Sequence, residues 1–177
     1  MIGSRHNRLN IMVTLATGVF AACAAQKTNG PIVIPATSNA VLQAVHEPGA
    51  KVVLVNMWAT WCGPCREEFP EIVKLSKNYR DRGLRVVFVS WDDDPGVAQK
   101  FLVKQGVNFP SYIKAASERD PDFINAIEPR WTGAFPATII FDGSGKVRAF
   151  WEGASTYATF EKNILDVLIQ QTQEAKS

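Results

Sequence analysis

The feature that most constrains the fold is a pair of cysteines, Cys62 and Cys65, placed directly after an apolar segment. Residues 50–59 (AKVVLVNMWA) form a nearly continuous apolar run rich in valine, which is typical of a strand buried on both faces. Pro64 suits the first turn of a helix, because its missing N–H needs no partner there. The segment therefore predicts a buried strand, a short turn, and a helix that begins at the cysteines.

This placement has chemical consequences for the two thiols. Cys62 is expected at the N-terminal end of the helix and Cys65 one turn further in. The exposed N–H groups and the helix macrodipole lower the pKa of a thiol there from about 8.5, which makes it a better nucleophile. The spacing brings the two sulfurs close enough to bond, so the pair can cycle between dithiol and disulfide.

Other uses of the pair find less support. The chain has three cysteines, and if Cys23 is lipidated or removed no second pair is available for a four-thiolate zinc site. His46 alone cannot complete a site of two cysteines and two histidines, and Arg66 stands where a haem attachment motif needs histidine. Two inert buried thiols remain an alternative, although Gly and Pro between them fit poorly inside a strand or a helix. No metal site is predicted.

The N-terminus has the pattern of a secretory signal. Residues 1–22 contain Arg5 and Arg8, no acidic residue, and then an apolar stretch that ends at Cys23. A short buried helix is the alternative. The ending VFAAC resembles a bacterial lipoprotein box with Cys23 as the lipidated residue, and the alanines around Cys23 also permit ordinary cleavage. Either outcome implies a location outside the cytoplasm, in the periplasm or cell envelope, where disulfides persist.

The length and the charge of the chain limit its domain organisation and its possible partners. The 177 residues suggest one domain, which we expect to span residues 37–177, after a lipid-anchor or spacer segment over residues 23–36. Removing residues 1–22 takes away two of the 19 basic residues and none of the 17 acidic ones, so the remainder carries no formal net charge. A nucleic-acid surface is therefore not indicated. No segment is long and apolar enough to span a bilayer, so any membrane attachment is by lipid anchor only.

The later segments alternate between strand and helix patterns. Residues 84–91 predict a second buried strand, and Asp94 with Pro95 predicts a helix start. The apolar face of that helix is assigned to Val97, Phe101 and Leu102. A calcium site at residues 92–94 is a weaker alternative, because the spacing of a calcium loop is absent.

The C-terminal part predicts a hairpin and a final helix. ATIIFD and KVRAFWEG flank the turn DGSG, and residues 156–171 form an amphipathic helix. Its apolar stripe is Phe160, Ile164, Val167, Leu168 and Gln171.

The motif WCGPC after a buried strand resembles that of the thioredoxins. The longer pattern VNMWATWCGPCREEFP is similar to that of the extracytoplasmic TlpA/ResA-like thiol-disulfide oxidoreductases, over about residues 37–172. The resemblance implies an α/β thioredoxin fold with a central mixed β-sheet flanked by helices and a central insert. It implies that Cys62 attacks and Cys65 resolves, forming a redox disulfide, and that no cofactor is needed beyond the two thiols.

The resemblance also assigns residues around the cysteines. Pro136 matches a cis-proline beside the Cys motif, and Phe135 before it is expected to shape substrate choice, or else to pack beneath the Cys loop. Trp61 is a candidate for a hydrophobic rim around Cys62. The dipeptide Gly63-Pro64 is that of reducing thioredoxins.

Glu68 is assigned a role in proton transfer. Asn56 stands where many cytoplasmic thioredoxins carry a buried aspartate, and asparagine cannot take up a proton. In TlpA/ResA-like proteins a glutamate three residues after the second cysteine occupies a related position, which is Glu68 here. Residues three apart share a helix face, so Glu68 is expected on the side of Cys65, partly buried and with a raised pKa. The alternative is a solvated surface acid like Glu67.

Residues 106–133 form the expected insert, with a short helix over residues 121–127 and a loop that carries Trp131. In extracytoplasmic relatives such an insert contributes to partner recognition. Trp131 belongs either to the rim around Cys62 or to the core.

The expected function is reduction of protein disulfides outside the cytoplasm, with apocytochrome c as a candidate substrate and a membrane thiol-disulfide transducer as electron donor. Two alternatives stay open. One is a thiol peroxidase on the same fold, although no third cysteine remains once Cys23 is processed. The other is a non-enzymatic envelope lipoprotein that binds or scaffolds a partner.

Overall fold

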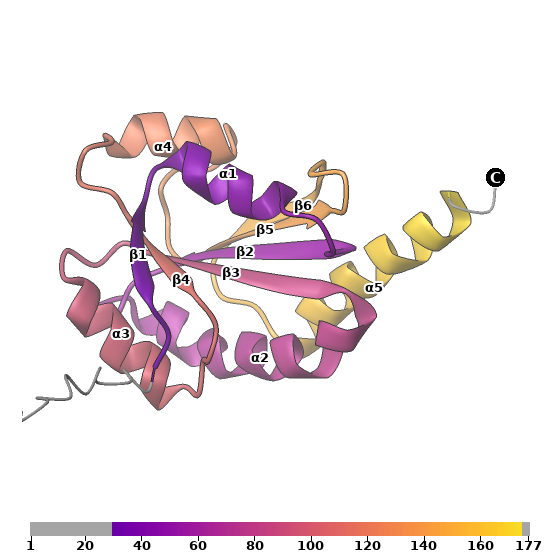
Figure 1. Ribbon diagram of the computed structural model, residues 1–177, viewed down its shortest axis with the longest axis horizontal. Helices are drawn as coiled ribbons and strands as arrows, with labels where there is room; N and C mark the ends of the chain where they lie inside the picture. Colours follow the sequence, from indigo (N-terminus) through magenta and orange to yellow (C-terminus); the bar gives the residue numbers. More distant parts are fainter. Residues whose placement is uncertain (1–29, 175–177) are drawn as a thin grey trace, which may run out of the picture.

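The computed structural model describes residues 30–174, which form one six-stranded sheet with helices on both faces (Figure 1). The strands lie in the order β1-β4-β3-β2-β5-β6. Their bounds are β1 Val33–Ala36, β2 Val52–Trp58, β3 Leu84–Ser90, β4 Ser111–Lys114, β5 Ala137–Asp142 and β6 Val147–Glu152. The pairs β1–β4, β4–β3 and β3–β2 are parallel, and β2–β5 and β5–β6 are antiparallel, which confirms the predicted mixed sheet.

The helices cover the two faces in two groups. Their bounds are α1 Ser38–His46, α2 Gly63–Tyr79, α3 Pro95–Lys104, α4 Asp120–Ile127 and α5 Tyr157–Glu174, with a 3₁₀ turn η1 at Arg80–Arg82. Helices α1 and α4 lie on one face, and α2, α3 and α5 lie on the other (Figure 1). Among residues 30–174, none of the helices combines the length and apolar character needed to cross a bilayer.

Strand β2 lies in the middle of the core. All seven of its residues are buried, with β3 on one side and β5 on the other. Because side chains alternate along a strand, Leu54 and Trp58 pack under α2, whereas Val53 and Val55 pack under α1 and α4. The valine-rich run is therefore explained by burial on both faces.

The domain begins earlier than the sequence predicted. Residues 33–36 were assigned to the spacer, but they form β1, with Val33 opposite Ser111 and Ala36 opposite Lys114 in β4. A proline within a segment argues against a strand, which made β1 hard to predict. Pro35 is tolerated here because β1 lies at the edge of the sheet. The proposed signal over residues 1–22, Cys23 and the first part of the spacer lie outside the described residues.

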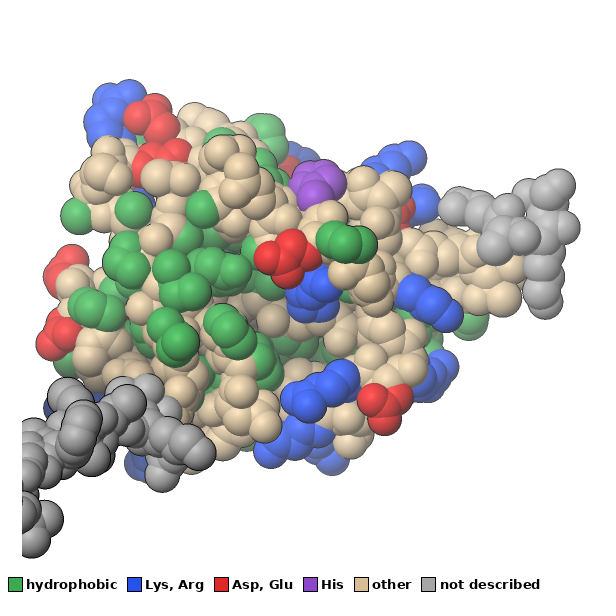
Figure 2. All heavy atoms as spheres, viewed as in Figure 1, with side chains coloured by type: hydrophobic (Ala, Val, Ile, Leu, Met, Phe, Trp, Pro, Cys, Tyr) green, Lys and Arg blue, Asp and Glu red, His purple; other side chains and the backbone are tan. Residues whose placement is uncertain are grey.

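The edge position of β1 also leaves apolar side chains at the surface. Ile32 and Ile34 are 61% and 39% exposed. Figure 2 shows hydrophobic side chains gathered over β1 and β4 on this face of the molecule.

The predicted insert is partly integral to the sheet. Its helix is confirmed as α4, but residues 111–114 form β4, which lies between β1 and β3. The other predicted elements are confirmed with small differences. In α3, Ala98 and Leu102 are buried while Val97 is 42% exposed, so the assignment of Val97 to the apolar face was wrong.

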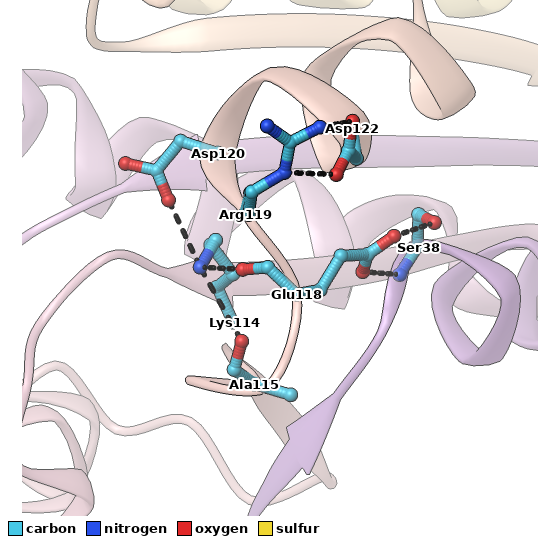
Figure 3. Close-up of polar contacts among 7 residues, drawn as sticks. All are labelled: Ser38, Lys114, Ala115, Glu118, Arg119, Asp120 and Asp122. Atoms are coloured by element: carbon cyan, nitrogen blue, oxygen red, sulfur yellow. Dashed lines mark hydrogen bonds and ion pairs between the residues drawn. The ribbon is translucent and has the colours of Figure 1, made fainter.

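A polar cluster fixes the connection between β4 and α4 (Figure 3). The Glu118 carboxylate accepts hydrogen bonds from the Ser38 backbone N–H at 2.7 Å and the Ser38 hydroxyl at 2.6 Å, at the start of α1. The Lys114 ammonium donates to the carbonyl oxygen of Glu118 at 2.6 Å and lies 2.9 Å from Asp120 Oδ1. The cluster therefore ties the ends of β4, α1 and α4 together.

Glu118→Ala should lower the free energy of unfolding by about 1–3 kcal/mol, because it leaves two donors at the buried start of α1 without their acceptor. Asp122→Ala is the control: its ion pair with Arg119 is exposed to solvent and should contribute less to stability. Urea unfolding of both variants measures the difference. Equal effects of the two substitutions would contradict this account of the cluster.

Candidate active site

Cys62 and Cys65 form a disulfide at the N-terminus of α2. The S–S distance is 2.02 Å and the Cα atoms are 5.3 Å apart. Cys62 is the N-cap residue, and its Sγ accepts a hydrogen bond from the Cys65 backbone N–H at 3.2 Å. The predicted pair and its position at the helix start are confirmed.

The two sulfurs differ in their access to solvent. Cys62 is 6% exposed and Cys65 is fully buried, while Gly63 and Pro64 between them are exposed. The Cys65 backbone N–H at the start of α2 points to the Cys62 sulfur, and N–H groups at a helix N-terminus in general stabilise a thiolate. Chemistry with an external partner can therefore begin only at Cys62.

Two aromatic side chains in contact with each other lie next to the cysteine motif in the fold. Trp61 is 63% exposed, and its ring meets that of half-buried Phe135 edge to face at 5.7 Å. The Phe135–Pro136 peptide bond is cis, as the resemblance implied. The ring contact places the residue before Pro136 beside the residue before Cys62.

Trp131 belongs to the core. It is 3% exposed, and its indole N–H donates to the carbonyl oxygen of Ala134 at 2.9 Å. Its ring lies 5.6 Å from that of Phe135 and 5.1 Å from that of Trp91. Phe135 thus packs on the core with one side and on Trp61 with the other, while its effect on substrate choice stays a prediction.

Glu68 lies buried in the layer between the sheet and α2. It is 2% exposed, whereas the adjacent Glu67 is exposed, so the alternative of a surface acid is excluded. Oε1 accepts a hydrogen bond from Asn56 Nδ2 at 2.9 Å, and Oε2 accepts one from the Ser155 backbone N–H at 2.8 Å. Burial raises the pKa of Glu68 from its ordinary value of 4.5 to about 7, against the opposing effect of these two hydrogen bonds.

Asn56 connects Glu68 to strand β5. Its Nδ2 also donates to Thr138 Oγ1 at 3.1 Å, and its Oδ1 is buried without a hydrogen-bond partner. The amide can donate and accept hydrogen bonds but cannot take up a proton near neutral pH. In this network Glu68 is therefore the group that can change its charge.

Two contacts of the site were missed by the sequence analysis. Ser155, which donates to Glu68, lies 87 residues further along the chain, and no local pattern indicates it. Asp92 is 8% exposed and accepts hydrogen bonds from Thr60, just before the cysteines. The sequence does indicate this contact, because Thr60 and Asp92 follow two predicted strands, and the carboxyl ends of neighbouring parallel strands meet at one edge of a sheet.

The calcium alternative at residues 92–94 is not supported. The Asp92 carboxylate is occupied by hydrogen bonds from Thr60 and Ser90, and the Asp94 carboxylate accepts from Gly96 at the start of α3. Within residues 30–174, no cluster of three or more His, Cys, Asp or Glu side chains is placed to hold a metal ion.

Comparison with known proteins places these features among redox proteins. The model of the Redoxin family matches residues 27–167. HelX of Rhodobacter capsulatus, a thiol:disulfide interchange protein, is 33% identical over 125 residues, which cover 70% of this chain and 64% of HelX. The thiol-disulfide oxidoreductase ResA of Oceanobacillus iheyensis is 30% identical over 122 residues, covering 68% of this chain and 59% of ResA. The chain thus spans less than two thirds of either relative.

A solved structure shows the same architecture. The crystal structure of a putative thiol:disulfide interchange protein DsbE from Chlorobium tepidum is 29% identical, with a TM-score of 0.59. The match covers 72% of this chain and 84% of that one. The thioredoxin-like fold is therefore shown by structure as well as by sequence pattern.

Replacement of Glu68 by glutamine should remove a pH dependence of stability. A carboxyl whose pKa rises from 4.5 unfolded to about 7 folded favours the folded state fully below pH 4.5, and this advantage is lost as the pH rises through about 7. The loss is about 3 kcal/mol, at 1.36 kcal/mol per unit of pKa. The difference in unfolding free energy between the parent and Glu68→Gln should therefore change by about 3 kcal/mol as the pH rises from 4.5 through about 7.

Urea unfolding of the disulfide form at several pH values measures this gap. Glu67→Gln is the matched control, because its side chain is exposed on the same helix turn. A gap for Glu68→Gln that stays constant from pH 4 to 8, like that of the control, would refute the raised pKa.

Proposed function

Because this chain belongs to the Redoxin family, we propose that it is a thiol-disulfide oxidoreductase that reduces disulfide bonds of other proteins. The observation that supports the proposal is the Cys62–Cys65 disulfide at the N-terminus of α2, with one sulfur accessible and the other buried. The names of HelX and ResA agree with this chemistry. The Gly63-Pro64 dipeptide favours the reducing direction.

The reaction proceeds in two exchanges. The Cys62 thiolate attacks one sulfur of a substrate disulfide; a bond forms between Cys62 Sγ and that sulfur, the substrate bond breaks, and the departing thiolate takes up a proton. Cys65 then loses its proton and attacks Cys62 Sγ. This second exchange closes the Cys62–Cys65 disulfide, releases the second substrate sulfur as a thiol, and completes the transfer of two electrons to the substrate.

Glu68 has the position and the pKa for the proton of Cys65. It follows Cys65 by three residues on the same face of α2 and is buried. A carboxyl with a pKa of about 7 can accept a proton and release it near neutral pH. We assign it as the group that takes this proton when Cys65 attacks.

Substrate contact is assigned to the exposed aromatic rim. Trp61 and Phe135, which precedes the cis bond to Pro136, offer apolar surface beside Cys62. A protein disulfide fits this surface, and apocytochrome c is a specific candidate. A membrane thiol-disulfide transducer would return the dithiol to its reduced form, which requires an extracytoplasmic location.

Cys62→Ser should abolish the reduction of insulin disulfides by the chain with dithiothreitol as electron source, since the attacking sulfur is gone. Cys65→Ala should keep the first exchange and accumulate a mixed disulfide with the substrate, which non-reducing electrophoresis detects. Cys62→Ala is the control for the trap and should accumulate none. A parent protein without insulin reductase activity would instead favour a binding or scaffolding protein.

The N-terminal assignments lead to a separate experiment. If residues 1–22 are a signal and Cys23 is lipidated, chain recovered from cell envelopes should have the mass of residues 23–177 plus a lipid group. Cys23→Ala should move the protein from the membrane to the soluble fraction. Membrane attachment that persists in this variant would overturn the lipid anchor while leaving the thiol chemistry intact.

A further inference from the structure

Asp92 is a buried carboxylate that the proposed thiol chemistry does not use. It lies two residues beyond β3, and both of its oxygens accept a hydrogen bond from the Thr60 backbone N–H, at 3.2 and 3.1 Å. Its Oδ1 also accepts from the Thr60 hydroxyl at 2.6 Å, and its Oδ2 accepts from the Ser90 hydroxyl at 2.6 Å. Three donors thus converge on one carboxylate.

These hydrogen bonds link the segments that follow β2 and β3, beyond the last paired residues of the two strands. The pairing of β2 with β3 stops at Trp58 opposite Ser90, and the Trp91 backbone N–H donates to the Trp58 carbonyl oxygen at 2.8 Å. Beyond that point Asp92 binds Thr60 through its side chain. The Cys62 backbone N–H then closes a turn onto the carbonyl oxygen of Ala59 at 3.2 Å. The approach to Cys62 is therefore fixed by Asp92 on one side and by its own turn on the other.

The same short segment supports the opposite side of the rim. The Trp91 ring lies 5.3 Å from the Phe135 ring, which in turn contacts Trp61. Asp92 thus holds Thr60, Thr60 precedes Trp61, Trp61 meets Phe135, and Phe135 packs on Trp91. Trp61 is therefore held through Thr60 on one side and by the Phe135 ring on the other. If Thr60 loses its hydrogen bonds to Asp92, only the contact with Phe135 still holds Trp61.

We propose that Asp92 is a positioning residue that holds Trp61 beside Cys62 for contact with a polypeptide substrate, an inference that rests on the proposed function. An exposed tryptophan keeps a defined place only where the backbone beneath it is held. Asp92 makes no contact with either sulfur among the hydrogen bonds of the described residues, and it acts through Thr60. Its removal leaves Cys62 at the helix N-terminus but lets the rim beside it move.

This role predicts a difference between two classes of disulfide. A protein substrate needs both the Cys62 sulfur and the Trp61–Phe135 surface, whereas a small disulfide such as bis(hydroxyethyl) disulfide needs the sulfur alone. Loss of Asp92 should therefore slow the reaction with protein disulfides far more than the reaction with the small one.

The experiment uses the full-length chain in its dithiol form and follows single-turnover reduction of insulin and of bis(hydroxyethyl) disulfide. Asp92→Ala removes the acceptor of all three donors, and Thr60→Val removes the hydrogen bond from the Thr60 hydroxyl. Thr60→Ser keeps that hydroxyl and should rescue the rate. Asp94→Ala is the matched control, since it deletes an acid two residues away that caps α3 and does not touch Thr60.

For Asp92→Ala we expect the rate with insulin to fall about 10-fold or more, because small displacements of positioning groups cost rates of this order or greater. The rate with the small disulfide should stay within about twofold of the parent, since Cys62 keeps its place at the helix N-terminus. Thr60→Val should show the same selectivity to a smaller degree, and Thr60→Ser and Asp94→Ala should match the parent with both substrates.

Equal losses with the two substrates, or no loss with either, would overturn the positioning role. Circular dichroism decides which variant is used: where Asp92→Ala does not fold, the ratio of the two rates in Thr60→Val decides alone. A parent chain that reduces neither disulfide refutes the proposed function itself, whereas an active parent with an unselective Asp92→Ala refutes only the inference about Asp92.

Discussion

The structure depends on the burial of strand β2 between two neighbours and two helical layers. Each of its residues is buried, and its direction delivers the chain at one edge of the sheet, where α2 begins. A strand held on both sides cannot shift its register without moving Leu54 and Val55 to the opposite layers. The core thus sets where the chain leaves β2 and where α2 begins with Cys62 as its N-cap.

Buried acids show how the same fold sets different protonation behaviour. Burial raises the pKa of Glu68 to about 7 because its two hydrogen bonds do not compensate for the lost solvent. Burial acts in the same direction on Asp142, but hydrogen bonds from Ser144, Arg148 and Lys146 outweigh it and lower the pKa to about 2. The number and charge of the donors therefore decide whether a buried acid titrates near neutral pH.

Features encoded in contiguous sequence were predictable, and those that depend on distant partners were not. The apolar run of β2 and the Pro64 helix start gave the strand, the helix and the cysteine pair, because each is a local pattern. Strands β1 and β4 have four residues each, too few to show a period, and they are defined by their pairing with each other. The burial of Glu68 was implied by the family resemblance together with its helix spacing from Cys65, but its contact with Ser155 is formed only by the completed fold.

The residues near Cys62 and those near Cys65 come from different parts of the fold, and they have different roles in the proposed exchange. On the side of Cys62, an aromatic surface lies next to the ends of β2 and β3, where Thr60 donates hydrogen bonds to the Asp92 carboxylate. On the side of Cys65, the buried Glu68 is the group that can gain or lose a proton. In the proposed reaction a substrate would meet the aromatic surface beside Cys62, while the proton of Cys65 would pass to Glu68. Recognition and proton transfer can therefore be altered separately by substitution, because no side chain is shared between the two sets of contacts described for Thr60 and Glu68.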